Sequence, residues 1–158
     1  MPRLSQLMIR TALVWLALGY SLGGLVLLNK GVPLLPWLWA LRSSHIHILL
    51  VGWTVQLACG VAFWILPRLD AGGSRGDERL VWGCYLCLNV GVALAALHGP
   101  LTTLPAAAPI GGALLIVVGL AYLAAALLFL LHAWPRVVPF RLLPRPARAG
   151  PDNQDDPS

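Results

Sequence analysis

Charged residues are scarce in this sequence. Its 158 residues include only eleven Lys or Arg and six Asp or Glu, so 11% of the chain is charged, against about 25% in soluble domains. Three ranges, 11–29, 43–67 and 80–135, contain none of the four charged residue types. A helix that crosses a membrane needs about 20 consecutive apolar residues. The sequence therefore excludes a soluble monomer and predicts an integral membrane protein.

The alternation of apolar and polar residues that marks a transmembrane β-barrel is also missing, because the apolar runs are continuous. The third run is long enough for two helices, and residues 98–105, HGPLTTLP, interrupt it with turn-forming residues. We therefore predict an all-α, four-helix transmembrane bundle over residues 1–140. Its helices are expected at about 8–28, 44–66, 79–98 and 108–133. Residues 141–158 are rich in proline, arginine and acidic residues and are expected to form a disordered cytoplasmic tail.

Cysteine is rare, and all three cysteines fall inside predicted helices. Cys84 and Cys87 form one CxxC pattern, but no second pair and no histidine at zinc-finger spacing accompanies it. Small residues at steps of three and four instead indicate faces where helices approach closely. Two such faces are predicted, one at Gly19 and Gly23 and the other at Cys84, Cys87, Gly91 and Ala95.

The basic residues are distributed unevenly between the two ends of the predicted helices. Lys and Arg are retained on the cytoplasmic side of a membrane. Only Lys30 and Arg42 lie at one end, and all the other basic residues lie at the opposite end or in the tail. We therefore expect both termini in the cytoplasm of a bacterial-type cell, with the bundle in the inner membrane. Topology and anionic lipids account for the basic isoelectric point, so no nucleic-acid partner is expected.

Histidine is costly inside a bilayer unless it faces a partner, a cofactor or water. His45, His47 and His98 are predicted at the outer side, whereas His132 is expected at the cytoplasmic interface. Counted from the arginines at the cytoplasmic helix ends, His45 lies about 34 Å and His98 about 28 Å along their helices. Their similar depths predict that these two imidazoles meet.

His45 and His47 are two residues apart, so their side chains diverge by about 200° around a helix. The face of His45 continues through Gly52 and Gln56, which suit a bundle interior, and Arg42 lies one turn earlier. Two histidines at matched depth with a nearby arginine suit haem b, since the imidazoles can ligate the iron and the arginine can bind a propionate. We therefore expect His45 and His98 as iron ligands.

Residues 42–53, RSSHIHILLVGW, resemble the second helix of haem-copper oxidase subunit I. The nearest likeness is to the large subunits of nitric oxide reductases and to small oxidase-I-like membrane proteins. In that superfamily the histidine of the Arg-x-x-His pattern is an axial ligand of the low-spin haem, and this position corresponds to His45. The likeness continues through Gln56, Gly60, Ala62, Trp64, Pro67 and Arg68.

The superfamily's other motifs are absent from this sequence. It has four predicted helices instead of about twelve, and it lacks the His-Pro-Glu-Val type motif, the histidine pair and the later His-x-His. Independent oxygen or nitric oxide turnover is therefore not expected.

Two hypotheses about the function remain. The first is a haem b protein for electron transfer or for sensing or handling a diatomic gas, with its second axial ligand from His98 or a partner subunit. The alternative is a cofactor-free accessory or assembly subunit of a respiratory membrane complex. Under either hypothesis the expected partners are the lipid bilayer and either further copies of this chain or the subunits of a respiratory complex.

Overall fold

The computed structural model describes residues 1–33, 35–68 and 75–137. The predicted disordered tail, 141–158, lies outside these residues. Within the described ranges the chain forms helices and no strands, and four helical spans are long and apolar enough to cross a membrane. The predicted all-α, four-helix bundle is confirmed, and its length and composition are those of a multi-pass membrane protein.

The first span is α1 (Arg3–Gly31). The second runs continuously from Pro36 to Ile65 and combines a 3-10 turn, two α-helical segments and a π-helical segment between them. The third is α4 (Glu78–Leu101), and the fourth is α5 (Ala108–Val137), preceded by the short 3-10 helix η3 (Pro105–Ala107). The segments of the second span are η1 (Pro36–Ala40), α2 (Leu41–His47), η2 (Ile48–Val55) and α3 (Gln56–Ile65).

The helices extend beyond the uncharged runs that predicted them. Helix α1 begins at Arg3 and includes Arg10 and Lys30, although its start was expected near residue 8. An uncharged run marks the part of a helix that can lie in hydrocarbon, and long basic side chains let the helix continue into the headgroup region. Helix α4 begins after Asp77, whose carboxylate accepts a hydrogen bond from the backbone N–H of Arg79, as an N-cap does.

Helix α4 also continues past His98, where a turn was expected, and contains Pro100 in its last turn. Proline has no N–H, so it cannot bond to the carbonyl four residues earlier. That carbonyl belongs to Ala96, and it accepts a 2.6 Å hydrogen bond from the hydroxyl of Ser44 in α2. The proline thus frees an acceptor that ties two spans together near the end of the bundle.

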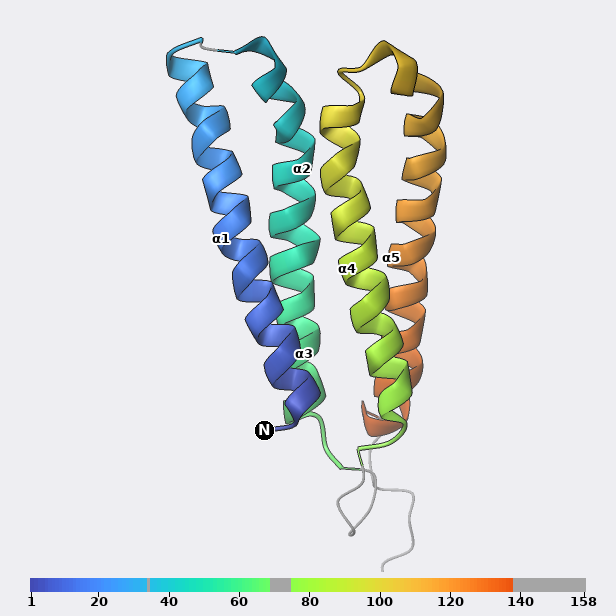
Figure 1. Ribbon diagram of the computed structural model, residues 1–158. Coiled ribbons are helices and arrows are strands. Elements are labelled where there is room, and N and C mark those ends of the chain that lie inside the picture. Colours follow the sequence, from blue (N-terminus) through green and yellow to red (C-terminus); the bar gives the residue numbers. More distant parts are fainter. Residues whose placement is uncertain (34, 69–74, 138–158) are drawn as a thin grey trace, which may run out of the picture.

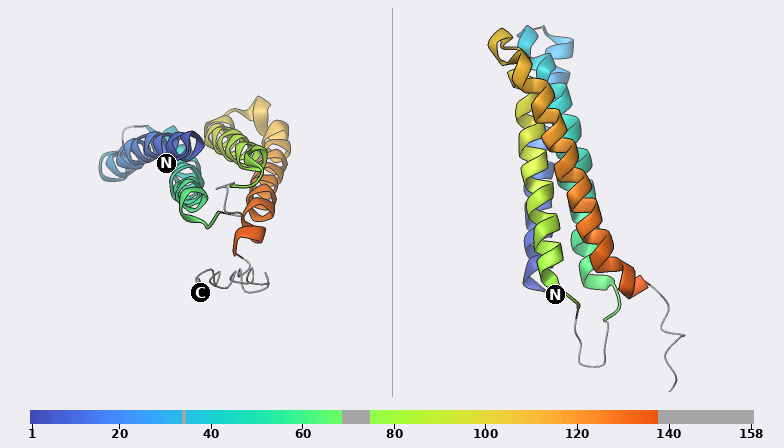
Figure 2. Two further views of the ribbon diagram at one scale, coloured as in Figure 1. Left: turned by 90° about the horizontal axis from the view of Figure 1, so that it is seen from below. Right: turned by 90° about the vertical axis from the view of Figure 1, so that its right-hand side faces the viewer.

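The spans run alternately up and down, and the N-terminus lies at the same end of the bundle as the end of α5 (Figure 1). Helix α1 packs along the second span, while α4 packs against both α2 and α5. Helix α5 makes its extensive contacts with α4, so it stands at the edge of the bundle in the view along the helices (Figure 2, left). The arrangement leaves one side of α5 facing the second span across a groove.

Between residues 44 and 60 the second span buries every fourth residue: Ser44, Ile48, Gly52, Gln56 and Gly60. In an α-helix a four-residue step overshoots one turn by about 40°, so such a row would drift around the axis. The π-helical turns of η2 hold more residues per turn and reduce this drift. The wider turns therefore keep the row directed at α1 and α4.

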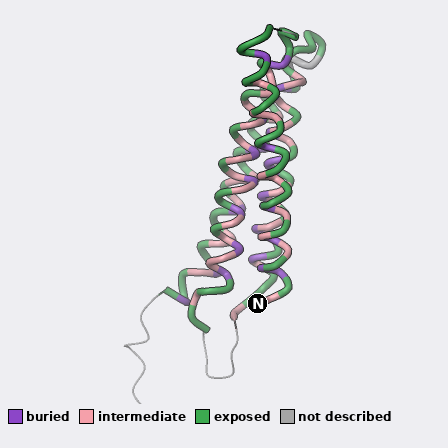
Figure 3. Tube along the Cα trace, turned by 90° about the vertical axis from the view of Figure 1, so that its left-hand side faces the viewer, coloured by how far each residue is buried: buried purple, intermediate pink, exposed green. Residues whose placement is uncertain are grey.

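Buried residues lie along the lines where helices face one another, and exposed residues cover the outside of the bundle (Figure 3). In α1 and α5 only 11% of the most apolar 18-residue stretch of the helix is buried, against 28% and 33% in the second and third spans. These exposed faces are rich in Leu, Val and Ile, which suits contact with lipid. The fold thus consists of two inner spans and two outer helices.

A close approach between the second span and α4 depends on Gly99 in α4. A Cβ at this position would collide with the backbone carbonyl of Ala40 in η1. We expect Gly99→Ala to lower the free energy of unfolding by about 1–3 kcal/mol, because a backbone atom cannot move aside as a side chain can. Gly119→Ala is the matched control, since nothing lies within 4 Å of its added Cβ and alanine favours helix. Thermal unfolding in detergent measures both, and equal melting temperatures for the two variants would contradict the predicted contact.

Candidate functional site

His45 is seated against α1 by two glycines. Its ring Nδ1 lies 2.8 Å from the carbonyl oxygen of Gly19, and a Cβ on Gly23 would lie only 2.5 Å from its Cε1. A carbonyl can only accept, so Nδ1 carries a proton and donates it. In a neutral imidazole this leaves Nε2 with a free lone pair. Metal-ligating histidines typically show this arrangement, with one nitrogen held by a carbonyl and the other presented to the metal.

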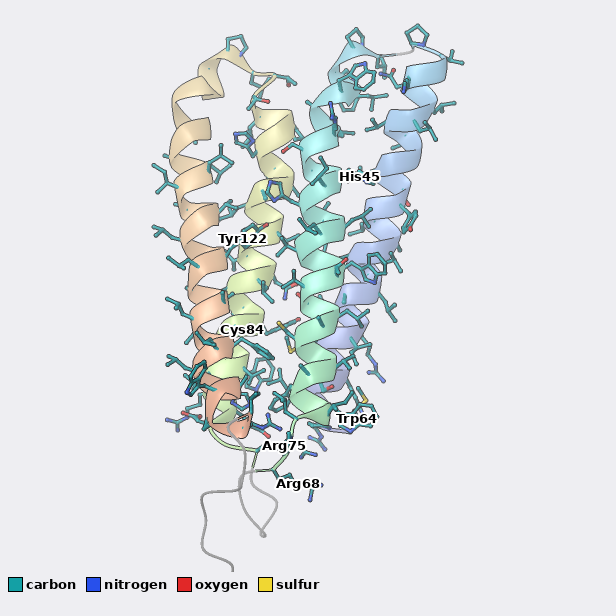
Figure 4. All side chains as sticks on the ribbon, turned by 180° about the vertical axis from the view of Figure 1, so that it is seen from behind. His45, Trp64, Arg68, Arg75, Cys84 and Tyr122 are labelled. Atoms are coloured by element: carbon teal, nitrogen blue, oxygen red, sulfur yellow. The ribbon has the colours of Figure 1, made fainter. Side chains whose placement is uncertain are left out.

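The seat of His45 uses the predicted small-residue face of α1. Gly19 also lets Leu49 and Ile48 approach, since an added Cβ would collide with the side chain of Leu49 and lie 3.1 Å from Cγ2 of Ile48. The half-buried His45 ring borders a shallow surface depression of about 320 Å³ together with Ile46, Leu49, Leu50 and Thr54. Figure 4 places His45 far from Arg68 and Arg75, toward the opposite end of the bundle. The His45 ring therefore lies between α1 and α2, at the edge of this surface depression.

His47 points toward a different helix. Its ring centroid lies 6.1 Å from that of Tyr122 in α5, with the ring planes tilted by 33°. Both histidines belong to the regular helix α2, and their divergence is what two residues of an α-helix produce. One imidazole of the pair therefore contacts α1, and the other faces α5.

His98 occupies the last turn of α4 and also faces α5. A Cβ on Gly111 of α5 would lie 3.6 Å from His98 Nε2. The ring of His45 contacts α1, so the structure brings these two predicted ligands against different helices. Arg42, the predicted propionate partner, is exposed one turn before His45. It lies where a charged side chain can reach the headgroup region.

Gln56 is completely buried and joins three spans through hydrogen bonds. Its Nε2 donates to the carbonyl of Met8 in α1 at 3.2 Å, and its Oε1 accepts from Asn89 Nδ2 in α4 at 2.9 Å. Asn89 also donates to the carbonyl of Tyr85 and accepts from Trp15 Nε1 at 2.8 Å. Every polar atom of the two amides thus has a partner, and the network fixes α1, α3 and α4 relative to one another.

A second polar cluster closes the end of the bundle that carries the N-terminus. Arg136 of α5 is 4% exposed, and its guanidinium donates to the carbonyls of Pro67 at 2.9 Å, Leu66 at 2.7 Å and Phe63 at 3.4 Å. It lies 2.8 Å from Nε2 of His132. Because the last carbonyls of a helix have no partner within it, Arg136 caps the C-terminal end of α3.

The cysteines contribute to packing, as their spacing predicts. Cys84 is buried with Leu88 and Ala125, and Cys87 packs against this cluster. Cys59 packs beside a neighbouring cluster of buried residues, Leu4, Met8, Phe63 and Val81. All three are free thiols. Within residues 1–33, 35–68 and 75–137, no group of three or more His, Cys, Asp or Glu side chains lies together in a way that could hold a metal ion.

Three features of these sites were not predicted from the sequence. Asn89 is the only side-chain amide in the charge-free range 80–135, and that isolation could have marked it as a buried partner of Gln56. His132 was expected at the cytoplasmic end of its helix, and its burial was not predicted: it is 3% exposed, and Arg136 and the carbonyl of Asp77 bond to its ring. Tyr122 had no distinguishing signal, since a tyrosine in an apolar helix more often marks an interface.

The side chains fit haem b in part. His45 presents one nitrogen for an axial bond, and haem needs only two protein ligands, whereas a zinc site needs three or four. The second axial position has no imidazole beside His45 within the described residues: His47 and His98 contact α5, and His132 lies at the other end of α5. No family model matches the chain, and comparison with curated proteins and with solved structures finds no match either.

Proposed function

We propose that this chain is a membrane haem b protein that transfers electrons or senses or handles a diatomic gas. The observation that supports this most directly is the held imidazole of His45, whose Nδ1 donates to Gly19 while Nε2 is left for a metal. His45 is also the residue that the Arg-x-x-His resemblance marks as an axial ligand. When bound, haem supplies one-electron redox chemistry or a site for a gas.

The chain's own residues have distinct roles in this proposal. His45 would hold the iron, and Arg42, exposed one turn earlier, would neutralise a propionate. Gln56 keeps the second span in register with α1 and α4 through its bonds to Met8 and Asn89. It therefore acts as a positioning residue. The second axial ligand comes from His98 within the chain or from a partner subunit.

Replacing His98 distinguishes these two sources. We expect His98→Ala to leave a five-coordinate, high-spin haem that binds carbon monoxide, because one axial position becomes free. Visible spectra of the purified, reduced protein with and without carbon monoxide measure this change. A low-spin spectrum in His98→Ala would show instead that another chain, or His132 after a rearrangement, supplies the second ligand.

In this proposal the bundle lies in a bacterial-type inner membrane, with the N-terminus and the C-terminal end of α5 both on the cytoplasmic side. This orientation rests on the uneven distribution of basic residues and on the shared end of the N-terminus and α5. Reporter fusions after Arg75 and after Thr103 should read as cytoplasmic and external, respectively. The opposite readout would invert the bundle and place His45 on the cytoplasmic side.

A second candidate function is an accessory or assembly subunit that carries no cofactor. It is favoured by the exposed faces of the two outer helices, since α1 and α5 each bury only 11% of their most apolar window. Such faces can pack against the helices of a larger respiratory complex as well as against lipid. The two candidates differ in one observable, because only the first contains haem when the purified protein is supplied with it.

A further inference from the structure

Helix α5 is bonded to the second span by the side chain of Arg136. The extensive contacts of α5 are with α4, and it makes few with η2 or α3. The guanidinium of Arg136, in the last turn of α5, donates to the carbonyls of Leu66 and Pro67 at the end of α3. These bonds lie at the end of the bundle that carries Arg68 and Arg75 (Figure 4). Arg136 therefore holds an outer helix against an inner span.

The hydrogen bonds around His132 define its protonation state. Its Nδ1 lies 3.2 Å from the carbonyl oxygen of Asp77, and a carbonyl can only accept, so Nδ1 carries a proton. Its Nε2 lies 2.8 Å from Nη1 of Arg136, and a guanidinium can only donate, so Nε2 accepts and carries no proton. The imidazole in this structure is therefore neutral, with both of its nitrogens bonded.

A second proton on His132 is incompatible with its contact to Arg136. An imidazolium has two N–H donors and no acceptor, so Nε2 would direct a proton at another donor and two cations would lie in contact. Both side chains are nearly enclosed, with His132 3% and Arg136 4% exposed. Water therefore screens the repulsion between the two charges only weakly.

The other charged groups near this pair do not remove the conflict. Among the described residues they are Asp77 and Glu78 at the start of α4, which attract a proton to His132, and Arg75, which adds a further positive charge. From α3 the ring of Phe63 packs on the imidazole, with 5.3 Å between ring centroids, and it is uncharged. The group that faces Nε2 is still the guanidinium, so protonation has to displace it.

We propose that His132 and Arg136 form an acid-sensitive latch, in which protonation of His132 displaces Arg136 from the end of α3 and releases the end of α5 from the second span. Pro135 lies inside the last turns of α5 and has no N–H to bond the preceding turn, so the residues that carry the guanidinium are held less firmly by their own helix. His45 lies toward the opposite end of the bundle (Figure 4). The latch is therefore independent of haem binding.

Thermal unfolding of the full-length protein in detergent tests the latch at about pH 7.5 and about pH 5, on either side of the ordinary histidine pKa of about 6.5. The neutral imidazole accepts from Arg136, so its stabilising bond is present above this range and is lost as the pH falls through it. We expect acid to lower the melting temperature of the wild type by about 4–8 °C more than that of His132→Gln. This is the scale of a lost hydrogen bond to a charged group.

His132→Gln is the matched control because it does not titrate. A glutamine oxygen can accept from Arg136 and its amide can donate to Asp77 at either pH, so the latch should stay closed. His132→Lys introduces a fixed positive charge at the same position. It should unfold at the lower temperature already at about pH 7.5 and change little more in acid.

The movement of α5 is measured by electron-electron resonance between spin labels, in protein whose native cysteines are replaced by alanine. One pair of labels, at Ile65 of α3 and Trp134 of α5, spans the latch, and both positions are exposed. Their separation should lengthen and broaden in acid, but not when His132→Gln is also present. A second exposed pair, at Leu86 of α4 and Leu127 of α5, lies along the extensive contact between these helices and should keep its distance.

Two results would overturn the proposal. The first is an equal effect of acid on the melting temperatures of the wild type and His132→Gln, which would assign the acid sensitivity to other groups. The second is an unchanged separation of the labels at Ile65 and Trp134 at about pH 5, in protein whose helix content is intact by circular dichroism.

Discussion

His45→Ala should remove the low-spin haem spectrum, whereas His47→Ala should leave it largely intact. The two residues lie in the same short helix at nearly the same depth, and only one of them can serve the iron. His45 donates its Nδ1 proton to Gly19 and presents Nε2, while His47 lies beside Tyr122 of α5. Side chains about 200° apart around a helix cannot reach one iron. Visible spectra of the two purified variants, each supplied with haem, measure the difference.

The comparison is robust because neither change should unfold the bundle. His45→Ala removes one hydrogen bond to Gly19, a loss of about 1 kcal/mol, and both variants keep the Gln56 network that joins α1, α3 and α4. Circular dichroism should confirm equal helix content. The assignment of His45 is wrong if His47→Ala loses the low-spin spectrum and His45→Ala keeps it.

Arg136→Met should lower the free energy of unfolding by about 2–3 kcal/mol, the scale of hydrogen bonds to a charged group. The guanidinium donates to the carbonyls of Pro67 and Leu66 and lies 2.8 Å from His132, and methionine supplies none of these donors. The carbonyls of Leu66 and Pro67 would then lose their side-chain donor, and Nε2 of His132 would lose its contact with the guanidinium. Chemical or thermal unfolding in detergent measures the loss.

The control for this variant is Arg79→Met at the same end of the bundle. Arg79 is exposed, and the hydrogen bond at this position involves its backbone N–H, so the substitution removes the same charge without removing a buried contact. Its stability should stay within about 0.5 kcal/mol of the wild type. If the two substitutions destabilise the protein equally, net charge and not the cap of α3 is responsible.

The fold class could be predicted because the membrane imposes it. An uncharged run of about 20 residues has few alternatives to a transmembrane helix, since backbone groups must be paired inside a bilayer. The helix ends were harder to predict, as α1 and α4 show: arginines and a proline lie within the helices themselves. The π-helical segment η2 was not predicted, because no residue type in 48–55 specifies it.

For the candidate site, the sequence predicts which histidines to consider but not the contacts that they make. Helical geometry correctly separates His45 from His47, since both belong to a regular helix. Depth alone suggested that His45 and His98 meet, but depth contains no information about which way α4 is rotated. In the structure His98 faces Gly111 of α5. Whether the two bind one iron stays a prediction that the spectrum of His98→Ala tests.

Contacts that depend on three-dimensional packing could not be read from the sequence. Arg136 bonds to carbonyls about 70 positions earlier in the chain, and Asn89 connects Gln56 to Trp15. The Tyr122 hydroxyl is buried without a partner among the described residues, which depends likewise on how its ring packs against Gly91 of α4. Polar side chains inside a membrane are expected to have hydrogen-bonding partners, but the sequence does not identify which residues those partners are.

The central claim is that the chain binds haem b, and a reduced-minus-oxidised visible spectrum of the purified wild-type protein, produced with haem supplied, tests it most directly. The account predicts the sharp bands of a low-spin b-type haem, with haem and protein present in a fixed ratio. A purified, helical protein whose spectrum contains no haem band would contradict it and favour the cofactor-free accessory subunit.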